Sequence, residues 1–392
     1  MRTGVATVPL DYGRCPRWLF ERMTRLGRGI SIAIVEEFGP EELLKRLSDP
    51  VWFQSLGCVM GFDWNSSGLT VTTMGALKEA VRGLETDLGF YICGGKRVSH
   101  KTPEETQKWG QYLGWEESKT NGLVNASKMA AKVDSSLIQD GFSIYAHNLL
   151  FTNSGKWAVI QQGMNVDVQK ARRYHWLSDG VNDFTEEPHS GIASDARLTP
   201  LNLTARESKQ NKEISSDMVK LEPDAFLKNF QSAAQEVSKN MPAVSSPVGK
   251  SLGSQGRLPG FTDMELNNVE FHWHPVVAEK FDIKRLKKTI EKAHFSAPDN
   301  FAALLAGEGI GPKTIRALSL VAEIVYGAKP SYEDPARYTF AVGGKDGTPF
   351  PVDRVTYDRT LSAIEKGIKQ SKMNQGEIDK AKERLETIIC PF

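Results

Sequence analysis

The chain has 392 residues, of which 40% are hydrophobic and 25% are charged, as in ordinary soluble globular proteins. This length exceeds what one core usually holds, so we expect two domains with room for a small third one. The formal net charge of +1 excludes a basic field over the whole molecule, so an anionic partner must bind at local patches. Because no run of eighteen apolar residues occurs, we expect a cytoplasmic protein that does not span a membrane.

The four cysteines are far apart in the chain and show no Cys-x-x-Cys spacing. They are Cys15, Cys58, Cys93 and Cys390, and they lie in or beside apolar runs. This pattern predicts buried thiols in a reduced compartment and gives no indication of a zinc site.

Residues 1–204 mix helical and strand patterns, so we predict an α/β (α+β) domain here. An amphipathic helix is expected after Pro16, and a short helix over 39–50 that begins at a proline and ends at Asp-Pro. The apolar runs LGCVMGF (56–62) and GFYICGG (89–95) are typical of buried strands. Residues 142–164 predict a β-hairpin whose turn is Asn-Ser-Gly.

Residues 205–262 change in character, from polar helical patterns to a segment rich in serine, proline and glycine. We interpret this stretch as a polar helical and flexible linker. Residues 263–392 are then expected to form a separate all-α domain.

The most informative stretch of that last domain is EGIGPKTIRALSLVAEIVYG, residues 308–327. Gly309 and Gly311 permit a tight turn, and Pro312 suits the first position of a helix. Backbone N–H groups would then point outward at a positive helix end and bind phosphate oxygens. An ordinary glycine-containing pair of helices is the alternative.

This stretch resembles the helix-hairpin-helix DNA-binding family, in which Gly-hydrophobic-Gly is followed by Lys-Thr. The matching residues are Gly309, Ile310, Gly311, Lys313 and Thr314. The resemblance implies binding of the DNA backbone without base reading.

The same stretch, followed downstream by PVDRVTYDR, also resembles the helix-hairpin-helix base-excision glycosylases. That resemblance implies a lyase in which Lys313 attacks the sugar and Asp353 stabilises the charge. The separation between them is about twice that of the family, because residues 329–350 form a long loop. The alternatives are a phosphate-binding Lys313 and a helix-capping Asp353.

Acidic residues in the first 204 residues are candidates for a metal-dependent catalytic site. Asp63 follows an apolar run, and in this it resembles the metal-binding aspartate of ribonuclease H-like nucleases. Asp63 could equally cap the helix that follows. Asp134 and Asp140 precede a predicted strand. If these carboxylates converge they would bind Mg²⁺ or Mn²⁺ and activate water, but both are also common turn and cap residues.

Polar residues around the second hairpin strand form a further candidate group. Gln161 and Gln162 lie in an apolar strand, where amides need partners or a cleft. Arg172 and Arg173 would then bind phosphate and His175 would act as acid or base, unless the arginines belong to a solvated loop. His189 could join this group as a ligand.

A basic cluster, GGKRVSHK, covers residues 94–101. Its Lys96 and Lys101 are predicted phosphate anchors or, alternatively, residues of an exposed loop.

Taken whole, the chain resembles the uncharacterised archaeal and bacterial family of unknown function DUF763. The segments that carry the resemblance are TVPLDYGRCPRWLFERMTRLGR, GFDWNSSG, WAVIQQGMN with ARRYHWL, and GIGPKTIRAL with GGKDGTPFPVDRVTYDR. The resemblance implies a prokaryotic, DNA-related protein.

Three functional hypotheses follow from the sequence. The first is a metal-dependent DNA nuclease of repair or recombination that binds DNA through the C-terminal hairpin. This hypothesis includes homodimer formation. The second is a DNA glycosylase or abasic-site lyase that uses Lys313 and Asp353. The third is a DNA-binding protein without catalysis.

Overall fold

The computed structural model describes residues 15–62, 68–96, 99–165, 170–194, 198–240, 282–338, 375–376 and 379. The predicted functional residues Asp63 and Asp353, and Cys390, lie outside these ranges. Within the ranges, no helix has the length and apolar character that crossing a bilayer requires.

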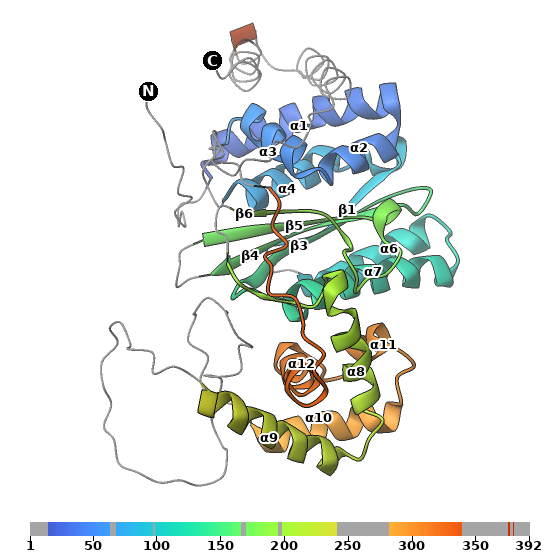
Figure 1. Ribbon diagram of the computed structural model, residues 1–392. Coiled ribbons are helices and arrows are strands. Elements are labelled where there is room, and N and C mark those ends of the chain that lie inside the picture. The colour runs from blue at the N-terminus through green and yellow to red at the C-terminus, as the bar shows by residue number, and fades with distance from the viewer. Residues whose placement is uncertain are drawn as a thin grey trace, which may run out of the picture.

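A five-stranded antiparallel sheet lies at the centre of the first part of the chain, in the order β1-β3-β4-β5-β6 (Figure 1). Its strands are β1 (Phe90–Lys96), β3 (Ser143–Thr152), β4 (Trp157–Asn165), β5 (Lys170–Leu177) and β6 (His189–Ser194). Two short strands, β2 (Ile138–Gln139) and β7 (Leu201–Asn202), form a separate antiparallel pair.

Helices cover both faces of the sheet, and further helices form a lobe beyond one of them (Figure 1). One face carries α1 (Arg17–Phe38), α2 (Pro40–Leu47), α3 (Pro50–Val59) and α4 (Gly68–Val81), with the short α5 (Glu85–Leu88) before β1. The other face carries α6 (Thr102–Tyr112) and α7 (Glu117–Ser136). The lobe contains α8 (Lys209–Met218), α9 (Pro223–Asn240), α10 (Ile283–Ser296), α11 (Phe301–Ala306) and α12 (Pro312–Tyr326).

The side-chain alternation of the strands explains why the protein has two cores. In β1, Phe90 and Ile92 pack against α1–α4, whereas Tyr91 and Cys93 pack against α7. Successive strand residues point to opposite faces, and both faces are apolar here, so each face buries its own helical layer.

The expectation of a separate all-α C-terminal domain is not confirmed by the packing. Val133 of α7, Phe230 of α9 and Leu318 of α12 belong to one continuous hydrophobic core. The physical reason is that the lobe helices have one apolar face each, and α7 supplies part of the surface against which those faces are buried. The first half of the predicted linker, which holds α8 and α9, is therefore part of this core.

The prediction of a strand over 56–62 is wrong, because residues 50–59 form α3. The Asp49 side chain accepts hydrogen bonds from the backbone N–H groups of Val51 and Trp52 and so caps the helix, whose first residue is Pro50. Asp-Pro thus ends one helix and starts the next. Leu56 and Val59 are buried on the core-facing side of α3.

Other predicted elements are confirmed. Residues 90–96 form a strand, and β3 and β4 form the expected hairpin with Leu149 opposite Val159. The hairpin turn is closed by the N–H of Thr152, which donates to the carbonyl of Lys156 at 3.0 Å. Gly155 has φ +91°, a conformation that disfavours other residues.

The three described cysteines carry free thiols, as predicted. Cys58 and Cys93 are buried and Cys15 is half-buried. Burial raises the pKa of Cys93 to about 12, so this thiol stays protonated and unreactive near neutral pH.

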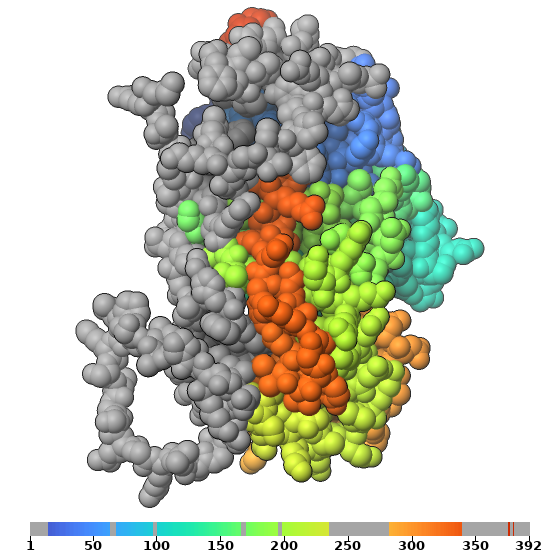
Figure 2. Space-filling model, viewed as in Figure 1, coloured from blue at the N-terminus to red at the C-terminus, as the bar shows by residue number. Residues whose placement is uncertain are grey.

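An extended segment, residues 327–338, leads from α12 back to the sheet. Figure 2 shows the orange chain running over the surface beside the helical lobe and up toward the sheet. Ser331 pairs with Asn202, and Tyr338 pairs with Ala193 of β6. We call residues 327–338 the strap.

Candidate functional site

The hairpin consists of α11, a glycine turn and α12, and its geometry follows the sequence closely. The Asn300 side chain caps α11, which ends at Gly307, and α12 begins at Pro312. Gly309 has φ +79°, which glycine adopts without the strain that a side chain would cause. Ile310 is buried and anchors the turn to the core beneath it.

Several backbone N–H groups at this turn lack a hydrogen-bond acceptor among the described residues. Gly309 is exposed and Gly311 half-buried. Within the ranges that the structure describes, the N–H groups of Gly309, Gly311 and Thr314 have no hydrogen-bond acceptor. Such groups at the start of a 15-residue helix form a positive end that suits an anion.

Basic side chains surround the turn. Lys313 is exposed on the first turn of α12. The turn also packs against α10, because a Cβ atom at Gly309 would lie 3.6 Å from Thr289. The α10 residues Lys284, Arg285, Lys288 and Lys292 are exposed. Lys292 forms an ion pair with Glu308 at 2.8 Å, whereas only one acidic residue, Glu291, lies within α10 itself.

The hairpin is fixed to α7 and β2 by buried polar contacts. Lys132 donates to the carbonyls of Leu305 and Gly307 at 2.7 and 2.8 Å, which satisfies the C-terminal end of α11. Gln139 donates to the carbonyl of Pro312 at 3.0 Å and accepts from Arg316. These contacts tie both ends of the turn to α7 and β2.

Asp134 and Asp140 do not lie together as metal ligands. Asp134 is in the last turn of α7, ahead of β2, and it is fully buried. Its carboxylate accepts from Gln161, from Trp176 Nε1 at 3.0 Å and from His189 Nε2 at 2.6 Å. In the described part of the chain no three metal-ligating side chains form a group. A magnesium or manganese site that includes Asp63 stays a prediction.

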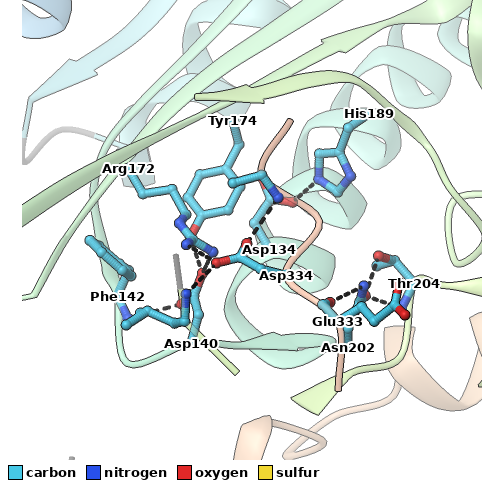
Figure 3. A network of polar contacts seen from close by, with 12 residues as sticks. Asp134, Asp140, Phe142, Arg172, Tyr174, His189, Asn202, Thr204, Glu333 and Asp334 are labelled. Carbon is cyan, nitrogen blue, oxygen red and sulfur yellow. Dashed lines mark hydrogen bonds and ion pairs between the residues drawn. The ribbon is translucent and has the colours of Figure 1, made fainter. Parts of the chain in front are cut away.

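Asp140 belongs to a second polar group, which holds the strap to the sheet (Figure 3). Arg172 of β5 donates to Asp140 at 2.8 Å and to Asp334 of the strap at 2.7 Å. Tyr174 and the backbone N–H of Phe142 also donate to Asp140. Burial alone would lower the pKa of Arg172, but its attraction to Asp140 and Asp334 outweighs burial and raises that pKa above the ordinary value.

Gln161 is the central link of a buried hydrogen-bond chain that the sequence did not predict in detail. Its Nε2 donates to Asp134, so its Oε1 accepts from His147 Nδ1 at 2.8 Å. Burial lowers the pKa of His147, so its Nε2 is unprotonated and accepts from the Ser127 hydroxyl at 2.7 Å. Ser127, His147 and Gln161 thus form one continuous line of donors and acceptors that ends at Asp134.

Arg173 and His175 face the layer that contains α3 and α4. Arg173 donates to His175 Nε2 at 2.7 Å, to Gln54 at 3.0 Å and to the carbonyl of Pro50 at 3.2 Å. Burial lowers the pKa of Arg173 to about 9. Burial, with Arg173 as a second cause, also holds the pKa of His175 well below its ordinary value.

The remaining predicted residues lie as follows. Gln162 is buried in β4. Lys96 and Lys101 are exposed, at the end of β1 and in the short helix η1 (Ser99–Lys101). Lys96 lies 6.0 Å from the ring of Tyr145. These two lysines are thus available to an anion but are not gathered with Arg172 and Arg173, which are buried.

A cavity of about 520 Å³ lies between β6, the loop after β7 and the strap. Its wall includes His189 of β6 and the acidic residues Glu187, Glu207, Glu333 and Asp334, with Arg337 as a basic residue. The side chain of His189 is 7% exposed. Its Nε2 bonds Asp134, and in the described residues Nδ1 has no hydrogen-bond partner (Figure 3).

Residues 4–352 match the family model described as "Protein of unknown function (DUF763)". The chain belongs to the DUF763 family. No curated protein and no solved structure matches it. Membership of DUF763 covers both the hairpin and the cavity, so it applies to all of the geometry described above.

The sequence predicted His189 only as an additional ligand of the group around Gln161. It did not predict that His147 contacts Gln161, that Ser127 contacts His147, or that Asp334 contacts Arg172. The available signal was the alternation in β3 and β4, which pairs His147 with Gln161 across the two strands. Asp334 could not be placed in this way, because it is 162 residues from Arg172 in the chain.

Proposed function

We propose that this DUF763 protein binds the DNA backbone through the turn between α11 and α12, as the gripping part of a DNA-processing protein. The observation that carries the proposal is that the backbone N–H groups of Gly309, Gly311 and Thr314, at the N-terminal end of α12, have no acceptor in the described part of the chain. Amides in this arrangement bind phosphate oxygens and provide no base contact, so binding should be independent of sequence.

The charge distribution supports the same surface. The chain as a whole is nearly neutral, yet exposed basic residues lie along α10, which contacts the turn at Thr289 and Lys292, and Lys313 is exposed on α12. Binding that depends on such local charges should weaken steeply as salt increases, because counterions are released from the DNA.

A glycine substitution can separate DNA binding from folding. Gly311 has φ −144°, which any residue adopts, and no atom lies within 4 Å of a Cβ atom placed there. Gly311→Ala should therefore keep the free energy of unfolding nearly unchanged. It should weaken DNA binding about tenfold, because the methyl group would stand between the amides and an approaching phosphate; one lost hydrogen bond to a charged group is worth about 1.5–3 kcal/mol.

The matched control is Gly122→Ala, at an exposed position on α7 that also has free space for a Cβ atom. Binding of fluorescein-labelled duplex and single-stranded DNA would be measured by anisotropy between 50 and 200 mM salt. If wild type, Gly122→Ala and Gly311→Ala bind DNA equally, or if none binds at low salt, the proposal is wrong.

The catalytic hypotheses remain predictions beyond this binding role. The nuclease hypothesis depends on Asp63, and the lyase hypothesis on Asp353, and both lie outside the described residues. Lys313 is exposed at the turn, where either a phosphate contact or attack on a sugar is open to it. Borohydride trapping on an abasic oligonucleotide, lost in Lys313→Ala, would establish the lyase.

A further inference from the structure

The cavity beside the strap has the chemistry of an acid–base site that is separate from the DNA-binding turn. His189 and Asp134 form its central pair, with 2.6 Å between Nε2 and Oδ1. The Asp134 side chain is completely buried and that of His189 is 7% exposed. The imidazole therefore lies between a buried carboxylate and the cavity.

The partners of Asp134 determine which of its oxygens faces His189. Oδ2 of Asp134 accepts from both Trp176 Nε1 and Gln161 Nε2, so Oδ1 is the oxygen that faces His189 Nε2. When Oδ1 accepts from Nε2–H of His189, the lone pair of Nδ1 has no partner in the described part of the chain. A carboxylate that orients an imidazole in this way prepares the opposite nitrogen to accept a proton.

The surroundings hold the ring in place. The ring of Trp176 packs edge-on against His189 with 4.6 Å between centroids, and Asp134 is held in turn by the chain from Gln161 to His147 and Ser127. His147 and Gln161 are thus positioning residues, since they act through Asp134 and do not touch the cavity wall.

The cavity wall indicates the charge of a ligand. Among its acidic residues, Asp334 is paired with Arg172, and Glu187 with Arg206 at 3.1 Å. Glu207 and Glu333 are exposed at the wall, and Arg337 is the single basic side chain there. The wall hydroxyls of Ser190 and Thr204 already donate to Ser48 and Asn202. The wall therefore offers mainly acceptors, which suit a ligand with N–H donors and positive charge.

We propose that this cavity binds a small cationic amine or guanidinium compound and that Nδ1 of His189 accepts a hydrogen bond from its N–H group. The Nδ1 lone pair accepts from the ligand N–H, while Asp134 holds the imidazole ring through Nε2. A volume of about 520 Å³ lies in the ordinary range of small-molecule sites. The inference does not depend on DNA binding, and the two can fail separately.

The substitution Asp134→Asn tests the role of the carboxylate. Trp176 Nε1 and Gln161 Nε2 are donors, so the new amide must turn its oxygen toward them and its NH₂ group toward His189. Nε2 of His189 must then accept, and the proton moves to Nδ1. The cavity loses its base although the shapes of the side chains are nearly unchanged.

The measurement is long-range ¹H–¹⁵N NMR of the full chain labelled in its seven histidines, with the His189 signal assigned by His189→Gln. We expect the Nε2–H form in wild type and the Nδ1–H form in Asp134→Asn, with the exposed Asp179→Asn as the matched control. The Nδ1–H form in wild type would overturn the proposal, and this result is available even if Asp134→Asn does not fold.

The ligand class is tested on wild type with agmatine and, separately, with inorganic phosphate. Agmatine should shift the His189 signals in a saturable way and phosphate should not. Glu207→Gln and Glu333→Gln should each weaken agmatine binding up to about fivefold, whereas the exposed Glu104→Gln on α6 should not. An unshifted His189 signal with agmatine, or a shift with phosphate instead, would refute the assignment. Gly311→Ala should leave the agmatine response unchanged, which separates this site from the DNA-binding surface.

Discussion

Replacing Arg172 by methionine should lower the free energy of unfolding by about 3–5 kcal/mol, the usual cost of removing one partner from a buried ion pair. The side chain of Arg172 is completely buried and is bound to Asp140, also completely buried, and to Asp334, which is 7% exposed. Without the guanidinium, two carboxylates would remain in a site that excludes water. Urea unfolding followed by tryptophan fluorescence would measure the change.

The double substitution Arg172→Met with Asp140→Asn should recover part of this loss, because only one buried carboxylate, that of Asp334, is then left without its ion-pair partner. The matched control is Arg17→Met, which breaks the exposed pair of Arg17 with Glu21 on α1 and should have a much smaller effect. A loss for Arg172→Met no larger than that for Arg17→Met would show that the pair does not hold the strap to the sheet.

Lowering the pH from 7.5 to 5.5 should destabilise the protein by about 2–3 kcal/mol through two buried histidines. Burial lowers the pKa of His147 and, together with Arg173, that of His175. In the unfolded chain both groups titrate near 6.5, so the unfolded state binds more protons below that pH. The stability is therefore present above about pH 6.5 and is lost below it, at about 1.4 kcal/mol per histidine and pH unit until the folded pKa is reached.

The variant His175→Gln separates this effect from other acid effects. The Gln oxygen can still accept from Arg173, yet it cannot be protonated in this range. Urea unfolding at a series of pH values should show about half of the wild-type acid sensitivity. An unchanged dependence on pH would mean that His175 is not kept neutral by the fold.

The hairpin was predictable because its signals are local. Gly309, Gly311 and Pro312 each have conformational restrictions that act within a few residues, and the structure shows the turn that they indicate. The same holds for β1 and for the β3–β4 hairpin, where apolar runs and a glycine turn lie next to each other. The 56–62 segment was misassigned because a short apolar run fits either a strand or a helix, and the Asp49 cap decided for the helix.

The partners of the candidate site were not predictable in this way. Asp134 and Asp140 resembled metal ligands in the sequence, yet each is occupied by N–H or O–H donors from other elements. Arg172 resembled a phosphate ligand, and it is instead bound to two carboxylates. A residue type shows which chemistry a side chain can perform, but its partners depend on contacts across the fold.

The sequence by itself determined the local elements, namely the capped helices, the alternating strands and the glycine turn, since these depend on backbone preferences and on near neighbours. Only the tertiary structure decided that α8–α12 share a core with α7, that the strap reaches Arg172, and that His189 lies between Asp134 and a cavity. The physical reason is that burial and hydrogen bonding between distant segments depend on which apolar faces pack together. The apolar face of one helix or strand can pack against the apolar faces of several others, so the sequence of one element does not determine its partner.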